Sequence, residues 1–398
     1  MSRSTRNSLF YFISAALLVI SLYLRYEGLK FISFDVINFV FPWYEYVQQN
    51  GLREALRHDF LNYNYSLAYL YLIALASETS SFLNRGSYHK LFGFLFDIFG
   101  ALIIYKIVFH KYKDIAISIL AALIFFTLPT VILNSSYWGQ ADNIYTAFLL
   151  CCVYFVLTDR PIWAVLAWGA AFSFKLQAIF LLPFLLFAVL IKKIKWWYLP
   201  LSLVVFLVLM APAVFVGRPF LAIFTPYFGQ ASGSPLWVYN SPSLYALFLS
   251  WLPINSPDLI VLPMVGLVVL AWVIISARTY RKGDDDYVLG IAFGSVAITA
   301  FLLPHMHERY FFPADALSLA LAFYVPGLYI LPISFQLSSY MVYRNYLYYD
   351  FERTYDLIRI LWAAVINLIS IMIFLGWQFY FRRFRKPQSG TTLQDGPE

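Results

Sequence analysis

The sequence contains few charged residues. Only 12% of its 398 residues are Asp, Glu, Lys or Arg, while 61% are hydrophobic. A soluble globular protein has roughly 25% charged residues. The mean hydropathy is +0.70, and the apolar residues form many runs close to the length of about 20 residues that crosses a bilayer. This composition excludes an ordinary soluble domain and predicts a polytopic helical membrane protein.

Cysteine and alternating apolar patterns are also scarce. The two cysteines, Cys151 and Cys152, are adjacent in an apolar run, where they cannot bridge to each other normally and lack the spacing of metal ligands. We therefore predict that they are packing residues. A membrane β-barrel would alternate apolar and polar residues over about ten positions, whereas residues 116–133 are apolar on every face. The predicted fold class is all-α.

The net charge of +7 comes from short basic clusters beside the apolar runs. This is the pattern of the positive-inside rule and not that of a nucleic-acid partner. The clusters, all placed in the cytoplasm, are Arg3/Arg6, Lys111/Lys113, Lys192/Lys193/Lys195, Arg278/Arg281/Lys282 and Arg382/Arg383/Arg385/Lys386. The path then has about 12 transmembrane helices, near 8–24, 90–109, 115–133, 144–158, 162–174, 178–191, 196–216, 259–278, 287–303, 312–325, 328–343 and 358–380. We predict one membrane domain, 1–380, and a basic and polar cytoplasmic tail, 381–398.

Three apolar segments do not fit an ordinary membrane span. The run 65–83 would invert everything after it if it crossed, so we predict an interfacial helix in the first outer loop, where its tyrosines suit the headgroup level. The helices near 162–174 and 178–191 are short, and broken helices are tolerated only where protein or a water-filled cavity surrounds them. The sequence therefore predicts a cavity.

Polar residues gather in outer segments of this path. Asp35, in the first outer loop, suits the N-cap of an interfacial helix or a general base that takes a proton from a hydroxyl, and the two roles are compatible. The segment YWGQADN offers an aromatic face, amides and a carboxylate that suit a sugar ring, with helix capping by Asp142 as the alternative. Its candidate sugar or acceptor ligands are Trp138, Gln140, Asp142 and Asn143.

Lys175 stands alone in an apolar stretch. Such a lysine either extends its amine to the interface or meets an anion, and a lipid phosphate is the anion we predict. Gln177, in the same short polar segment, is a further candidate for sugar or acceptor binding. Asp97 lies within an apolar run and is either functional or hydrogen-bonded to a neighbouring helix.

The segment HMHERYF, 305–311, carries several ionisable groups. His305 and His307 would diverge on a helix, and zinc needs more ligands than Glu308 adds, so a divalent metal is not favoured. The guanidinium fork of Arg309 suits phosphate, His307 can donate a hydrogen bond to it, and Glu308 can orient one of them or a sugar hydroxyl. A simple ion pair between Glu308 and Arg309 is the alternative.

With these residues in place, the chain resembles the GT-C-fold glycosyltransferases, which take sugar from a polyprenyl-phosphate carrier on the outer or lumenal face of a membrane. It is similar to prokaryotic mannosyltransferase-like proteins related to the second mannosyltransferase of glycolipid-anchor synthesis. The triplet His-Glu-Arg is also similar to lipid-linked glucosyltransferases of N-glycan assembly. The segments that carry the resemblance, within residues 34–314, are FDVINFVFPWYEYVQQNG, NYNYSLAYLYLIALAS with FGFLFDIFGALIIYKIV, VILNSSYWGQADNIYTAFLL with FSFKLQAIFLLP, and HMHERYFFPA.

The resemblance implies a GT-C-like fold and inverting transfer of a single hexose, with mannose favoured over glucose. The donor would be a polyprenyl-phosphate sugar and the acceptor a lipid- or glycan-linked hydroxyl. Asp35 would be the catalytic acidic residue, and Lys175 and Arg309 would contact the donor phosphate. The chain lacks the Tyr-Pro-Pro often seen in these proteins and any paired acidic motif.

The expected setting is a multi-pass protein among membrane lipids, with the bacterial inner membrane favoured and the site extracytoplasmic. The alternative is a transporter or flippase of lipid-linked sugars, which also needs intramembrane charge, broken helices and a cavity. The two halves of the sequence show no internal repeat of the kind such transporters have. A ligase that moves an entire glycan should need more extracytoplasmic basic residues.

Overall fold

A computed structural model describes residues 3–61, 63–78, 86–232, 236–248, 258–348 and 356–380. For residues 3–7 and 230–232 it describes the backbone alone. The predicted tail, 381–398, and the last part of the run 65–83 lie outside the described residues.

The part of the chain that the structure describes is almost entirely helical, as predicted. Its α-helices are α1 Arg3–Lys30, α2 Phe41–Arg57, α3 Leu67–Glu78, α4 Tyr88–Tyr112, α5 Ile115–Thr127, α6 Pro129–Ile132, α7 Asp142–Leu157, α8 Pro161–Phe174, α9 Leu182–Leu190, α10 Pro200–Phe215, α11 Thr225–Ser232, α12 Asp258–Thr279, α13 Asp285–Leu302, α14 Phe312–Tyr324, α15 Ile330–Leu347 and α16 Leu357–Phe379. Short π or 3₁₀ segments include η1 Val36–Val40, η2 Leu133–Trp138, η3 Leu176–Leu181, η4 Trp196–Tyr198 and η7 Glu308–Phe311. Strands β1 Val238–Tyr239 and β2 Met306–His307 pair in parallel.

Six helical stretches among the described residues are long and apolar enough to cross a membrane, and a bent pair would make a seventh. They are Ser8–Lys30, Tyr88–Tyr112, Trp196–Phe215, Asp258–Thr279, Asp285–Leu302 and Leu357–Phe379, with the bent pair Ile115–Thr127 and Pro129–Trp138. The protein is therefore an all-α polytopic protein. The path of 12 crossings stays a prediction, because helices such as α7 and α8 are shorter than a span.

The helix expected over 115–133 is broken into two parts. The chain bends by 52° between α5 and α6, because Pro129 has no N–H and forces the residue before it out of the helical region. Leu128 accordingly adopts φ −55° and ψ 134°. The bend frees the carbonyl of Phe126, which accepts hydrogen bonds from Ser21 Oγ at 2.9 Å and Arg25 Nη2 at 2.8 Å.

The same arginine closes a buried ion pair between helices. Arg25 Nη1 lies 2.5 Å from Asp97 Oδ2 and also donates to Ser135 Oγ at 2.8 Å. Asn143 Nδ2 donates to the other carboxylate oxygen of Asp97 at 3.3 Å. Of the two roles considered for Asp97, the structure shows the bond to neighbouring helices. The hydrogen bonds of Arg25 and Asp97 connect α1, α4, η2 and α7.

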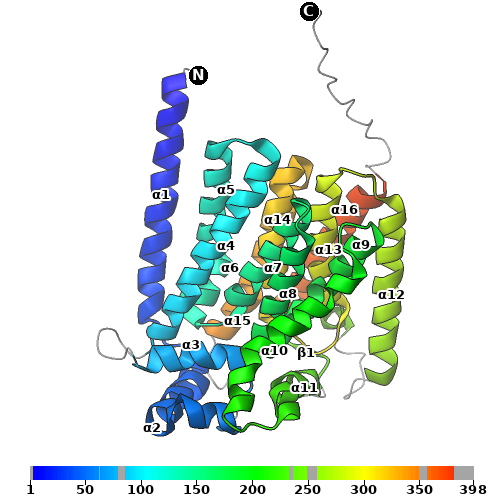
Figure 1. Ribbon diagram of the computed structural model, residues 1–398. Coiled ribbons are helices and arrows are strands. Elements are labelled where there is room, and N and C mark those ends of the chain that lie inside the picture. The colour runs from blue at the N-terminus through cyan, green and yellow to red at the C-terminus, as the bar shows by residue number, and fades with distance from the viewer. Residues whose placement is uncertain are drawn as a thin grey trace, which may run out of the picture.

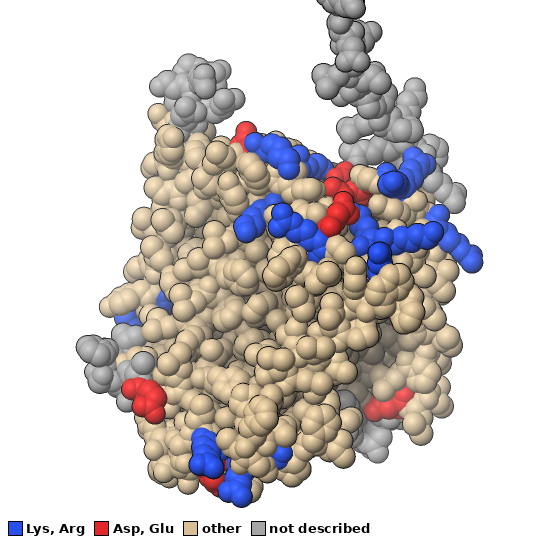
Figure 2. Space-filling model, in the orientation of Figure 1, with Lys and Arg blue, Asp and Glu red and all other residues tan. Residues whose placement is uncertain are grey.

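The helices form a bundle whose two ends differ (Figure 1). α13 lies inside it, with 83% of its most apolar window buried, whereas α1 lies at the edge, with 11% buried. Cys151 and Cys152 of α7 are buried in the main apolar core. α2, α3, α11 and β1 lie at the lower end. Figure 2 shows Lys and Arg gathered over the upper end, where α1 begins, with a smaller group at the lower end.

Candidate functional site

A cavity of about 710 Å³ lies within the described part of the chain, and its wall comes from segments far apart in the sequence. Its volume falls within the range of about 300–1,000 Å³ for small-molecule sites. All the polar outer segments singled out in the sequence contribute to it. The lining residues are Phe34, Asp35, Phe39, Val40, Trp43, Asn64, Tyr65, Tyr69, Gly139, Gln140, Lys175, Leu176, Gln177, Ile179, Phe180, Gly229, Tyr239, Leu262, Leu303, Pro304, His305, Met306, His307, Glu308, Arg309, Tyr310 and Tyr346.

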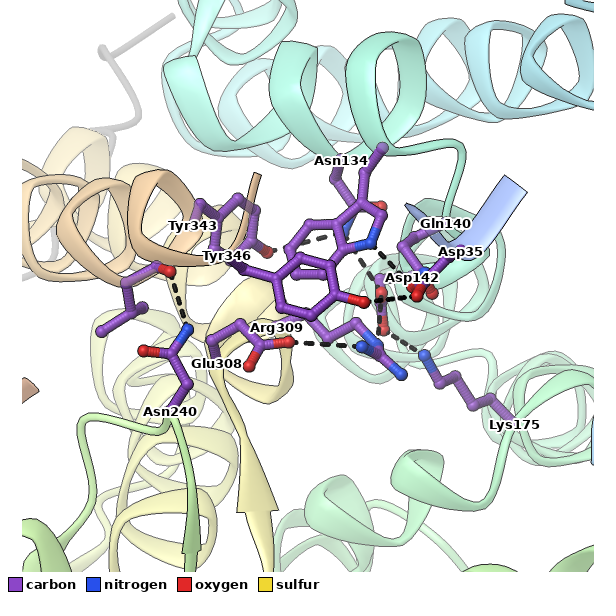
Figure 3. A network of polar contacts seen from close by, with 12 residues as sticks. Asp35, Asn134, Gln140, Asp142, Lys175, Asn240, Glu308, Arg309, Tyr343 and Tyr346 are labelled. Atoms are coloured by element: carbon purple, nitrogen blue, oxygen red, sulfur yellow. Dashed lines mark hydrogen bonds and ion pairs between the residues drawn. The ribbon is translucent and has the colours of Figure 1, made fainter. Parts of the chain in front are cut away.

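Asp35 is half-buried in this wall, just before η1. Its side chain makes no capping hydrogen bond. Instead it accepts hydrogen bonds from Trp138 Nε1 at 2.8 Å and Gln140 Nε2 at 2.5 Å, both on Oδ2, and from the hydroxyl of Tyr346 on Oδ1 (Figure 3). A carboxylate offers about four acceptor positions. Three donors therefore fix its orientation and leave one position on Oδ1 for a further donor.

Sequence reasoning missed Tyr346, which α15 brings to the site from 311 residues away in the chain. Its ring stacks on Trp138, with centroids 4.5 Å apart and an interplanar angle of 20°. Tyr65, a second tyrosine that was not predicted to act here, donates its hydroxyl to Gln140 Oε1 at 2.7 Å. The hydrogen bond from Tyr65 turns the amide nitrogen of Gln140 toward Asp35. Tyr65 therefore orients the carboxylate through Gln140, and Tyr346 orients it directly. Neither has a local motif that could have identified it.

A tight turn places Trp138 and Gln140 on the same carboxylate. η2 ends at Gly139, whose φ of +75° is in the left-handed region, where residues other than glycine are strained. A Cβ there would also lie 2.2 Å from Nε2 of the buried His89. Glycine is therefore required at this position on two separate grounds.

Lys90 connects the chain segment that leads to Asp35 with the turn at Gly139. Its buried ammonium donates to the carbonyl of Gly28 at 3.0 Å, of Phe31 at 2.5 Å and of Tyr137 at 3.1 Å. The first two precede Asp35 in the chain, and the third directly precedes Trp138. One side chain of α4 thus satisfies three carbonyls and fixes the distance between the two segments.

A second carboxylate, Asp142, lies behind the cavity wall and does not cap a helix. The N-cap position belongs to Ala141. Asp142 accepts from Lys175 Nζ at 2.5 Å and Asn134 Nδ2 at 3.2 Å, and lies 3.8 Å from Arg309 Nε. The side chains of Lys175 and Asp142 are 4% and 0% exposed. The anion beside Lys175 is therefore first of all this carboxylate, 33 residues earlier in the chain.

Arg309 is only partly satisfied by the protein. Its Nη1 lies 3.3 Å from Glu308 Oε1, and its guanidinium lies over the ring of Trp138 at 5.6 Å. Among the described residues its Nε lacks a hydrogen bond that meets normal geometry, as does Oε1 of Gln177. Buried polar groups without a partner are uncommon. Both residues line the cavity, although the Nε of Arg309 is itself buried and faces Asp142 at 3.8 Å.

The parallel pair of β1 and β2 sets the position of Glu308 and His307. Tyr239 is the register partner of His307, and the two rings stack with centroids 4.7 Å apart. Burial, with Arg309 and Lys175 nearby, holds the pKa of His307 well below its ordinary value, so the ring is neutral near pH 7. Burial raises the pKa of Glu308 to about 7, against the opposing effect of Arg309.

The structure brings together seven of the ten predicted site residues in the lining of the cavity. They are Asp35, Gln140, Lys175, Gln177, His307, Glu308 and Arg309. Trp138, Asp142 and Asn143 do not line it, and the predicted direct contact of these three with a sugar has no support in this placement. Asn143 donates to the carbonyl of Gly93 at 2.5 Å and to Asp97, because α7 turns its side chain toward α4.

In the described ranges no group of three or more His, Cys, Asp or Glu residues lies close enough to hold a metal ion. No protein-family model matches the chain, and no curated protein is significantly similar to it.

Proposed function

We propose that this protein is an integral membrane glycosyltransferase of the GT-C type. It moves a single hexose, with mannose favoured, from a polyprenyl-phosphate carrier to a lipid- or glycan-linked hydroxyl. One observation carries the proposal: a carboxylate with an unused acceptor position and two cations, Asp35, Lys175 and Arg309, line the same cavity. A hydroxyl nucleophile and a phosphate leaving group need these complementary charges.

In the proposed reaction the acceptor hydroxyl attacks the anomeric carbon. Its proton passes to Oδ1 of Asp35, the oxygen with the unused position, which is the task of a general base. The bond between the anomeric carbon and the phosphate oxygen breaks, and polyprenyl phosphate leaves with the bonding electrons. Attack from the face opposite the leaving group inverts the anomeric configuration. Trp138, Gln140 and Tyr346 act as positioning residues, because their hydrogen bonds hold the carboxylate.

Lys175 and Arg309 offset the negative charge that grows on the departing phosphate. Fixed cations act most strongly where water is excluded, and a guanidinium pairs with phosphate through two parallel N–H groups. Arg309 contacts Glu308 through Nη1, so a phosphate oxygen can approach its other terminal nitrogen while this contact is kept. The neutral His307 in the same wall can donate one further hydrogen bond.

The predicted orientation puts this cavity outside the cytoplasm. Under the positive-inside rule the basic upper end of the bundle faces the cytoplasm, and α2, α3, α11 and β1 lie at the other end (Figures 1 and 2). The cavity also has apolar lining from Leu176, Ile179 and Leu262, which suits the first units of a polyprenyl chain. A bacterial inner membrane with an extracytoplasmic site fits these features.

The proposal is tested by sugar transfer in liposomes. Purified protein is given a panel of radiolabelled polyprenyl-phosphate hexoses with membrane lipid extract as the source of acceptor. Loss of a general base lowers a rate by about 10²–10⁴-fold, so we expect Asp35→Asn to lose at least 100-fold. Glu54→Gln, a change of an exposed carboxylate in the same outer loop, should transfer normally.

Near-normal transfer by Asp35→Asn would remove this residue from the mechanism. Movement of labelled carrier lipid across the bilayer without any transfer would favour the flippase alternative. Arg309→Ala should raise the KM for the lipid donor far more than the KM for the acceptor, with Arg309→Lys between it and the wild-type protein. An unchanged donor KM would leave Arg309 a structural role.

A further inference from the structure

A second hollow, of about 380 Å³, lies on the described surface next to the cavity. The two share the lining residues Asn64 and Gly229. The rest of its lining comes from the first outer loop and from α11, namely Asp59, Phe60, Leu61, Tyr63, Thr225 and Pro226. The shared residues place it at the side of the cavity where Tyr65, the neighbour of Asn64, holds Gln140 in contact with Asp35.

The lining combines fixed aromatic walls with neutral hydrogen-bonding groups. Phe60 and Tyr63 stack with centroids 5.1 Å apart at 18°, and the Tyr63 hydroxyl donates to the carbonyl of Ser66 at 2.8 Å. These contacts make the wall rigid. Asn64 and Thr225, whose side chains carry an amide and a hydroxyl, belong to the same lining. Sites for small polar ligands are built in this way, with apolar walls and a few placed polar groups.

The one carboxylate among these lining residues, Asp59, is 64% exposed and is paired with a buried arginine behind it. The buried Arg218 forms an ion pair with Asp59 and also donates to the carbonyl of Leu56 at 3.2 Å and of Ala222 at 3.3 Å. The hollow therefore has hydrogen-bonding groups but no lysine or arginine in its described lining. This suits the hydroxyl groups of a neutral saccharide better than a phosphate or a uronic acid.

From these observations we infer that the hollow binds the saccharide part of the acceptor and delivers its hydroxyl to Asp35 through the gap between Asn64 and Gly229. The inference rests on the proposed function and adds a substrate class to it: the acceptor is a neutral glycan whose sugar lies in the outer hollow. The donor would use the phosphate-binding side chains and apolar lining of the larger cavity.

Gly229 provides a sharp test of this site. A Cβ at this position meets no atom within 4 Å, so a side chain can be attached here without moving the backbone, and we expect Gly229→Trp to fill the gap. Gly266 of α12 likewise has open space around it but belongs to neither lining. Gly266→Trp is therefore the matched control, and Gly229→Leu, with a smaller side chain, should have an intermediate effect. Thermal unfolding in detergent checks that all three variants are folded.

Two measurements follow. In the transfer assay, Gly229→Trp should raise the KM for acceptor at least tenfold and leave the donor KM within twofold, while Gly266→Trp changes neither. In saturation-transfer NMR with mannobiose, a neutral disaccharide, the wild-type protein and Gly266→Trp should give a signal that Gly229→Trp loses. An acidic disaccharide containing glucuronic acid should give little signal with any of them.

An unchanged acceptor KM for folded Gly229→Trp, with the mannobiose signal intact, would overturn the inference and leave the proposed function standing. A stronger signal from the acidic disaccharide would also overturn it. A wild-type protein that transfers no sugar would instead contradict the proposed function, whatever mannobiose does.

Discussion

The Asp142→Asn substitution removes the carboxylate that neutralises Lys175. Both side chains are buried and 2.5 Å apart, and removal of one partner of a buried ion pair typically destabilises a protein by about 3–5 kcal/mol. The remaining lysine can release its proton. An ordinary lysine pKa of about 10.4 lies about 3.4 units above pH 7, and each unit is worth about 1.36 kcal/mol. Keeping Lys175 neutral in the folded state therefore costs about 4.6 kcal/mol at pH 7, which agrees with the first figure.

This destabilisation has a definite pH dependence. In the single variant the unfolded chain binds one more proton than the folded protein between the lowered folded pKa of Lys175 and about 10.4. Stability rises with pH wherever the unfolded state binds more protons. Burial lowers the pKa of Lys175 in the wild-type protein to about 8, so the deficit relative to the wild-type protein should shrink by about 1.4 kcal/mol per pH unit from pH 7 to about 8 and stay level above that. Thermal or denaturant unfolding in detergent at pH 7, 8 and 9 measures it.

The double variant Asp142→Asn/Lys175→Met separates structure from function. It leaves no unpaired charge at this position, so most of the lost stability should return. If Lys175 contacts the donor phosphate, the folded double variant should still have a donor KM raised at least tenfold. A double variant no more stable than Asp142→Asn would refute the reasoning about the pair. A stable double variant with a normal donor KM would confine Lys175 to a structural role.

Two further predictions concern Glu308 and Gly139. Because burial raises the pKa of Glu308 to about 7, its contribution to stability is complete below the unfolded pKa of about 4.3 and is lost as pH rises to about 7. Glu308→Gln should remove this pH-dependent fall in the free energy of unfolding. Profiles of the free energy of unfolding that stay parallel for the two proteins over pH 4.5–7.5 would contradict the assignment. Gly139→Ala should cost about 1–2 kcal/mol of backbone strain and also lose turnover, because its Cβ would lie 2.2 Å from His89 Nε2. Gly283→Ala, with φ +83° and open space around it, should share the strain and keep normal turnover, and equal kcat values for the two variants would argue against a fixed turn beside Asp35.

The sequence was a good guide to the helices and a partial guide to the site. Apolar runs predict helices because bilayer length and backbone hydrogen bonding leave few alternatives. The observed helices lie within a few residues of the predicted ones, apart from the break at Pro129, a residue whose effect could have been read from the sequence. The number of helices that cross the bilayer is less certain from the sequence, because six or seven of the described helical stretches are long enough to span it, against the 12 predicted.

The contacts that the sequence did not predict are between residues far apart in the chain. Lys175 looked isolated because its partner Asp142 lies 33 positions away, and Tyr346 reaches Asp35 across 311 positions. Such pairs depend on how the helices are arranged, which local spacing does not encode. The same limit explains Asn143, whose side chain turns toward α4, and Trp138, whose indole supports Asp35 without lining the cavity.

The ion pair between Arg25 and Asp97 has a consequence for biogenesis. Arg25 belongs to α1, which the ribosome releases before α4, and its counterion follows 72 residues later. An unpaired arginine within a membrane helix costs up to about 2.5–3.5 kcal/mol on translocon-based insertion scales. We expect the newly made α1 to be a weak anchor that stays beside the translocon until α4 and the carbonyl of Phe126 arrive. Insertion would then be cooperative, with α1 secured by helices synthesised after it.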